Sequence, residues 1–287
     1  MRGGLRVKLG TFTVSAIETG TFRLDGGAMF GVVPKVLWSK TNPADENNRI
    51  SMAMRALFVE GTGHRLIIDS GAGTKLDEKM QRNYVIDTPG LKATIKGRGI
   101  DPSSITDAVA THLHFDHAGG FTYRDGEGTL HLVLPNATHY IQRKQWESAL
   151  SVNERDRASF FPENFLPIKE VGTLQLLDGK TEIFPGVTVI PTEGHTPGHQ
   201  IVLIETSDGN LLYCGDLIPL ASHVNLPYIM AYDHLPLQTL QEKKRILARA
   251  ADEGWILFFE HDPDIPACTV KRTDSGKFEI AERIHIG

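Results

Sequence analysis

Three histidines and an aspartate lie close together in THLHFDHAGG, residues 111–120 of this chain. Imidazole and carboxylate groups are the side chains that hold divalent transition-metal ions. His112 and His114 are two residues apart, so at the end of a strand their side chains leave the same face and can bind one ion. Asp116 and His117 follow where the chain must turn, and they suit a second ion. Chance would produce this H-x-H-x-D-H spacing roughly once in a thousand such chains, so the segment predicts a metal site.

Three later segments share one pattern, an apolar strand that ends in a residue able to bind a metal. VTVIPTEGH leads to His195, NLLYCGD leads to Asp216, and WILFFEH leads to His261. Sites are assembled at strand ends because a rigid sheet positions the loops. A lone histidine after a buried strand is more often structural. Combined with the first segment, however, these residues complete a set of histidines and aspartates that suits two adjacent ions with a shared water.

The elements that must position these residues follow from the hydrophobic pattern. Residues 55–59 and 65–69 flank a GTG turn and predict a β-hairpin. Further strands are expected at 107–112, 182–191, 200–206, 210–214 and 255–259. Gly, Pro and SDG turns separate the three strands between 182 and 214, and the later part of the chain alternates strands with helices. This order predicts an α/β layered sandwich, not a TIM barrel or a Rossmann fold. The clearest helix is expected over 235–253, with a buried stripe of Leu237, Leu240, Leu247 and Ala251, and with Gly254 at its end.

The composition limits the class of protein. The 287 residues are 40% hydrophobic and 23% charged, so we expect residues 1–287 to form a single domain. A formal net charge of −5 disfavours a nucleic-acid partner. Residues 1–16 lack the apolar stretch of a signal peptide, and no membrane span is expected. Cys214 and Cys268 are too few for a disulfide framework, which fits a cytoplasmic location.

The motifs resemble those of the metallo-β-lactamase superfamily, in which H-x-H-x-D-H is followed by a distant His, Asp and His. The resemblance implies a four-layer αβ/βα sandwich with two metal ions. It implies that one ion is held by His112, His114 and His195, the other by Asp116, His117 and His261, and that Asp216 bridges them.

Two positions narrow the choice within the family. True β-lactamases carry Cys or Ser where Asp216 stands, so that activity is disfavoured. N-acyl homoserine lactonases of the well-known type have a tyrosine three residues after the bridging aspartate, where this chain has Pro219. The overall layout is most similar to the branch that contains lactonases and methyl parathion hydrolase.

The expected function is a dinuclear metal-dependent hydrolase that uses a metal-bridging hydroxide. The expected substrate is a small molecule, a lactone or carboxylic ester with an apolar substituent. Zinc is the default ion, with iron, manganese or cobalt as alternatives. Asp116 is the expected catalytic residue, because it can pass the proton of the nucleophile to the leaving group. The alternatives are a phosphotriester hydrolase, a mononuclear iron persulfide dioxygenase, and a metal-binding protein without turnover.

Four further residues are candidates around the site. Asp69 can either orient a metal-binding histidine or hold its own loop through backbone amides. Residues 20–41 combine apolar side chains with glycine and proline. They can form a flap over the pocket, a homodimer contact, or ordinary core. Phe30 and Trp38 in this segment, and His223 after Asp216, are the expected substrate-pocket residues.

Overall fold

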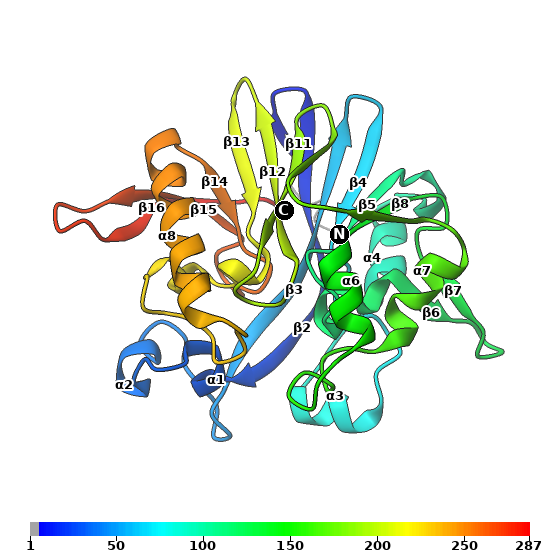
Figure 1. Cartoon of the computed structure of the whole chain (residues 1–287), viewed down its shortest axis with the longest axis horizontal. Coiled ribbons are helices and arrows are strands. Elements are labelled where there is room, and N and C mark those ends of the chain that lie inside the picture. The colour runs from blue at the N-terminus through cyan, green and yellow to red at the C-terminus, as the bar shows by residue number, and fades with distance from the viewer. Residues whose placement is uncertain (1–5) are drawn as a thin grey trace.

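The structure is a computed structural model that describes residues 6–287, so residues 1–5 of the N-terminal segment considered above lie outside it. Two seven-stranded sheets face each other (Figure 1). The first sheet contains, in spatial order, β1 (Val7–Leu9), β2 (Phe12–Asp25), β3 (Arg49–Gly61), β4 (His64–Ile68), β5 (Asp107–Val109), β8 (Thr138–Gln142) and β9 (Leu174–Leu177). The second contains β10 (Thr181–Phe184), β11 (Val187–Thr192), β12 (His199–Thr206), β13 (Gly209–Tyr213), β14 (Ile256–Phe258), β15 (Ala267–Arg272) and β16 (Phe278–Ile284). A two-stranded ribbon, β6 (Thr122–Arg124) and β7 (Leu130–Leu132), completes the strands of the described chain.

Eight helices accompany the sheets in the part of the chain that the structure describes. They are α1 (Gly26–Phe30), α2 (Lys35–Trp38), α3 (Glu78–Tyr84), α4 (Gly90–Gly97), α5 (Phe115–Ala118), α6 (Arg143–Leu150), α7 (Leu166–Glu170) and α8 (Pro236–Glu253). Four of them, α4, α6, α7 and α8, cover the outer faces of the sheets. Short 3₁₀ turns are η1 (Pro102–Ser104), η2 (Gly119–Phe121), η3 (Pro162–Asn164), η4 (Gly215–Leu217) and η5 (Ala221–Val224). No helix within residues 6–287 is long and apolar enough to cross a membrane.

Three buried apolar layers hold the sandwich together. Side chains of α4, α6 and α7 pack on the outer face of the first sheet. Valine, leucine and isoleucine side chains from both sheets fill the space between them. Side chains of α8 pack on the outer face of the second sheet, on the opposite side of the molecule (Figure 1). This order of layers, helix, sheet, sheet, helix, confirms the predicted αβ/βα sandwich.

Parallel strand pairs bring distant segments to one edge of the sandwich. β4 pairs in parallel with β5, so Asp69 and the segment that begins at Ala110 leave the first sheet side by side. β13 pairs in parallel with β14, so the segments that carry Asp216 and His261 leave the second sheet together. The turn between β11 and β12 carries His195. The carboxyl ends of parallel strands lie at the same edge, which is why these segments converge.

Helix α8 buries a face that overlaps the expected one in part, since Leu247 is fully buried and Leu240 and Ala251 are partly buried. Leu237 is 76% exposed, and Thr239, Glu242, Lys243, Ile246, Leu247 and Ala250 are the buried residues. The buried polar side chains anchor loops. Glu242 accepts hydrogen bonds from the backbone N–H groups of Glu193 at 2.9 Å and Gly194 at 3.2 Å, just before His195. Lys243 donates to the carbonyls of Asn225 and Tyr228, and burial lowers its pKa to about 7. The helix therefore positions the site as well as covering the sheet.

Candidate metal centre

Four of the expected metal-binding residues form a first donor group. One donor atom each from His112, His114, His195 and Asp216 lies within 4.8 Å of the others. His195 Nε2 is 3.3 Å from His114 Nδ1 and 3.1 Å from Asp216 Oδ2. Four ligands at about 2.1 Å from a tetrahedral zinc ion are roughly 3.4 Å from one another. The separations in this group are of that size.

The other three residues form a second donor group nearby. Asp116 and His117 lie in α5, directly after the strand end that carries His112, and His261 comes from the second sheet. His261 Nε2 is 3.1 Å from His117 Nε2 and 3.7 Å from Asp116 Oδ2. All three side chains are buried. The structure therefore brings all seven expected residues together as two adjacent groups.

Asp216 lies between the two groups and directs one oxygen to each. Its Oδ2 faces His195 in the first group. Its Oδ1 lies 3.4 Å from His261 Nε2 and 3.6 Å from His117 Nε2 in the second. Asp216 Oδ1 and His112 Nε2 are buried and have no hydrogen-bond partner among the described residues. A buried polar atom without a partner costs about 1–3 kcal/mol, so these atoms fit cations that complete their interactions.

The two groups differ in the charge that surrounds them. Burial, together with the neighbouring histidines, places the pKa of His112 and of His114 well below the usual value. These rings are therefore neutral and can offer lone pairs. Burial also acts to lower the pKa of His117, but the carboxylates of Glu260, Asp216 and Asp116 outweigh it and hold that pKa well above the usual value. The second group thus lies in a strongly negative surrounding that suits a cation.

Asp69 holds the outer nitrogen of His117. His117 Nδ1 is 3.1 Å from Asp69 Oδ2, which also accepts a 2.7 Å hydrogen bond from the Thr111 hydroxyl. Asp69 Oδ1 accepts the backbone N–H of Thr111 at 2.7 Å. The two roles considered for Asp69 therefore occur together. Its backbone has a φ of 57°, in the left-handed region that aspartate tolerates better than most residues.

Sequence reasoning missed three residues that support the donor groups. Asp233 Oδ1 lies 2.9 Å from His195 Nδ1. Glu260 Oε2 lies 2.8 Å from His117 Nδ1, and burial raises the pKa of its carboxyl group to about 8. Glu242 holds the loop before His195, as described above. From the sequence, Asp233 and Glu260 are visible only as acidic residues close to predicted elements. The spacing of neighbouring residues does not predict a contact with a residue far away in the chain.

A cavity opens directly over the donor atoms and has mainly apolar walls. It leaves about 60 Å³ open to solvent-sized molecules. Besides Ser159 and residues of the two donor groups, it is lined by Leu24, Met29, Met52, Tyr84, Phe115, Met230 and Tyr232. Tyr232 is 36% exposed and lies at its rim. Apolar walls around a few convergent polar groups are typical of small-molecule sites.

The expected pocket residues Phe30, Trp38 and His223 do not line this cavity, and that prediction was wrong. All three are at most 1% exposed. The Phe30 ring stacks between Trp38, at 5.1 Å, and His223, at 5.0 Å. His223 Nε2 also bonds the Met29 carbonyl at 2.9 Å. The stack is core behind α1, because the short helices α1 and α2 fold these rings inward. Of this segment, only Leu24 and Met29 reach the cavity.

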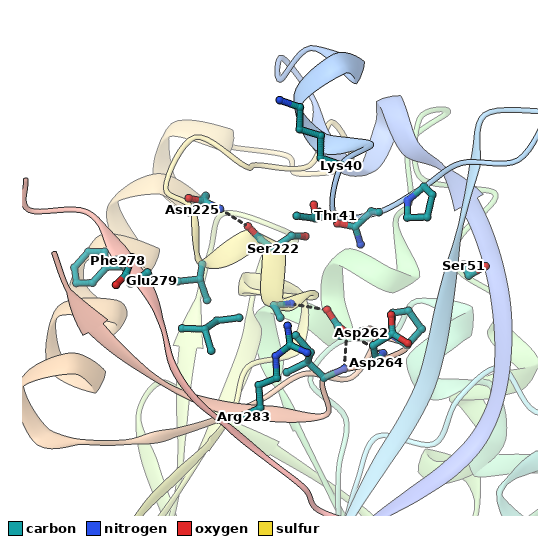
Figure 2. A pocket seen from close by; sticks show the side chains of 17 residues that line it. Lys40, Thr41, Ser51, Ser222, Asn225, Asp262, Asp264, Phe278, Glu279 and Arg283 are labelled. Carbon is teal, nitrogen blue, oxygen red and sulfur yellow. Dashed lines mark hydrogen bonds between the residues drawn. The ribbon is translucent and has the colours of Figure 1, made fainter.

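A larger hollow of about 710 Å³ is lined in part by the loop that directly follows His261. Figure 2 shows Asp262, Asp264 and Arg283 in it, opposite Lys40 and Thr41. Asp262 is the one buried charged residue among the described residues that line it. Its Oδ2 accepts the N–H of Ala221, and its Oδ1 accepts those of Asp264 and Ile265. Both oxygens of this carboxylate are therefore engaged in holding loops.

The chain is similar to known proteins in both sequence and structure. The family model of the metallo-beta-lactamase superfamily matches residues 55–261. The N-acyl homoserine lactonase AiiA of Bacillus thuringiensis subsp. kurstaki is 30% identical over 171 residues. That alignment covers 58% of this chain and 60% of the relative, so it spans less than two thirds of the relative's length.

Two solved structures superpose over nearly the whole chain. A probable metal-dependent hydrolase from Staphylococcus aureus has a TM-score of 0.87 and 32% identity, covering 97% of this chain and 100% of that one. AidC, described as a dizinc quorum-quenching lactonase, has a TM-score of 0.81 and 21% identity, covering 99% of each chain. At 21% identity, the similarity to AidC shows a shared fold only.

Proposed function

This chain belongs to the metallo-β-lactamase superfamily, and from that premise we propose that it is a dinuclear metal-dependent hydrolase that opens lactones. The observation that carries the proposal is Asp216, with one oxygen directed to each of two converging donor groups. N-acyl homoserine lactones are the first substrates to test, because they are the substrates named for AiiA and its relatives. The mainly apolar cavity wall supports a substrate with an apolar substituent.

The seven converging residues would hold two divalent cations, with zinc as the default for imidazole and carboxylate donors. Such cations, when bound, lower the pKa of a shared water and polarise a substrate carbonyl. Asp69 and Asp233 keep the rings of His117 and His195 oriented toward the site. Asp116 lines the cavity, where its carboxylate can accept a proton from the attacking water and return it to the ring oxygen that leaves.

The second donor group bears on the alternatives. A mononuclear iron dioxygenase binds one ion and does not need a second donor group such as that of Asp116, His117 and His261. Their convergence on Asp216 Oδ1 therefore favours two cations. Carboxylic esters share the carbonyl chemistry of lactones and belong to the same proposal. Both cysteines are buried and free, which supports the proposal of a reducing, cytoplasmic setting.

A turnover panel with metal analysis tests the function. Purified protein should contain close to two transition-metal ions per chain and should open N-acyl homoserine lactones faster than it hydrolyses aryl esters, phosphotriesters or glutathione thioesters. A strong chelator should abolish activity, and zinc, manganese or cobalt should restore it. Full activity in demonstrably metal-free protein would contradict the mechanism. A preference for phosphotriesters would show that these compounds, and not lactones, are the substrate class.

A further inference from the structure

The methionines of this chain are gathered in one place. Met29, Met52, Met54 and Met230 are buried in a single apolar cluster beside the metal centre, and Met80 packs against it. These are all the methionines within residues 6–287. The three clusters that build the sandwich contain none of them and use leucine, isoleucine, valine and aromatic residues instead. Methionine is unbranched and adapts its shape to irregular surroundings, so its position here calls for a reason.

The cavity over the donor atoms is small for an organic substrate. Its volume of about 60 Å³ is room for a few water molecules. Sites that bury a drug-sized ligand measure roughly 300–1,000 Å³. A lactone with an apolar chain therefore needs space that the wall must provide by moving.

The backbone around the cavity is closely held. Ala231 N–H bonds the Ala28 carbonyl at 2.8 Å, which ties α1 to the loop that carries Met230. Gly31 packs so tightly on the Ile229 carbonyl that a Cβ on it would lie 2.4 Å from that oxygen. Phe115 is flanked by the rings of Tyr84, at 5.8 Å, and Phe161, at 6.3 Å. Side chains with several free torsions are the parts of this wall that can move without moving backbone.

We propose that Met29, Met52 and Met230 form a deformable wall that makes room for the apolar chain of the substrate. The proposal rests on the proposed lactone hydrolysis. It adds the feature that determines which lengths of apolar chain the substrate can have. The three side chains come from α1, β3 and the loop after η5, and each is at most 3% exposed. Rotation of their thioether arms opens space for a long chain and closes it again over a short one. The enzyme should therefore accept apolar chains of different lengths.

A variant in which leucine replaces the three wall methionines, compared with a matched control, tests the proposal. Leucine keeps most of the volume of methionine but has fewer torsions, so the variant M29L/M52L/M230L should narrow the range of chain lengths. The kcat/KM ratio of decanoyl to butanoyl homoserine lactone should fall roughly tenfold relative to wild type. The control is Met54→Leu, because Met54 is buried in the same cluster without lining the cavity. It should keep the wild-type ratio. An unchanged ratio in the triple variant, or an equal fall in the control, would overturn the proposal.

A binding measurement on the wild-type protein separates the wall from the reaction. N-decanoyl-L-homoserine should shift the methyl NMR signals of Met29, Met52 and Met230 and leave that of Met54 in place. N-butanoyl-L-homoserine should shift them much less. Equal responses to the two chains, or none, would overturn the proposal. If the methyl signals respond by chain length and no lactone is opened, the proposed function fails and the wall stands.

Discussion

The two hollows, one lined by His261 and the other by the loop that follows it, differ in size and in the hydrogen bonding of their buried carboxylates. The larger, of about 710 Å³, contains Asp262, whose two oxygens accept three backbone N–H groups. The smaller, of about 60 Å³, contains Asp216, whose Oδ1 is buried without a hydrogen-bond partner in the described chain. A carboxylate with its partners in place stabilises a loop, whereas one without them is prepared for a ligand. Between these two buried carboxylates, the unpartnered oxygen of Asp216 lies at the donor groups, whereas the larger volume lies beside Asp262.

The largest effect, on metal content and turnover, should come from replacing Asp216 in the smaller hollow. Asp216→Asn should reduce the bound transition-metal ions from about two per chain to one or fewer and lower turnover to background, because both donor groups lose their shared charge. Elemental analysis and kcat/KM measure this. Asp264→Asn, in the larger hollow, is the matched control and should change neither value, since Asp264 is exposed. Two tightly held ions and full activity in Asp216→Asn would remove that residue from the site.

A smaller effect should separate the two donor groups. Asp69 contacts His117 of the second group, and Asp233 contacts His195 of the first. Loss of such a supporting carboxylate typically weakens metal affinity about 10–100-fold. Titration of the metal-free protein with zinc should show Asp69→Asn weakening one of the two binding steps and Asp233→Asn the other. If both variants weaken the same step, or neither does, these aspartates do not support separate ions.

The smallest effects are expected in the larger hollow. Asp262→Ala removes the acceptor of three backbone N–H groups and should lower the free energy of unfolding by about 1–3 kcal/mol. Arg283→Ala, at an exposed position in the same hollow, should lower it by less than about 0.5 kcal/mol. Urea unfolding measures both. Loss of turnover at unchanged stability in either variant would show that the larger hollow takes part in the reaction.

The supporting residues show where sequence reasoning stops. Asp69 was a candidate because it directly follows a predicted hairpin, and the structure places it on His117. Asp233, equally important for His195, stood in a loop with no distinguishing pattern. In α8, the leucine pattern correctly predicted that Leu247 is buried but wrongly included Leu237, which is exposed. It also missed Glu242 and Lys243, which are buried and hold loops. A hydrophobic pattern assigns polar residues to the surface. It cannot show that a polar side chain is buried because it bonds a residue far away in the sequence.

Residues 20–41 illustrate the same limit for apolar side chains. The pattern distinguished an unusual apolar segment, and three different structures were compatible with it. The structure assigns Phe30 and Trp38 to the core and Met29 to the cavity, although Met29 and Phe30 are adjacent in the chain. Neighbouring residues on a short helix point in different directions, so the packing of α1 against the loop near Met230 decides which one reaches the site.

By itself, the sequence identified the seven candidate donor residues that the structure brings together, and it indicated the layered fold, because closely spaced donors and strand ends are local patterns. A bridging role for Asp216 was implied by family resemblance, and the orientation of its two oxygens required the structure. Only the tertiary structure decided which side chains stand behind the histidines, which apolar residues line the cavity and how much room remains there. Those features depend on contacts between segments far apart in the chain. Such contacts stabilise the fold without producing a periodic pattern in the sequence.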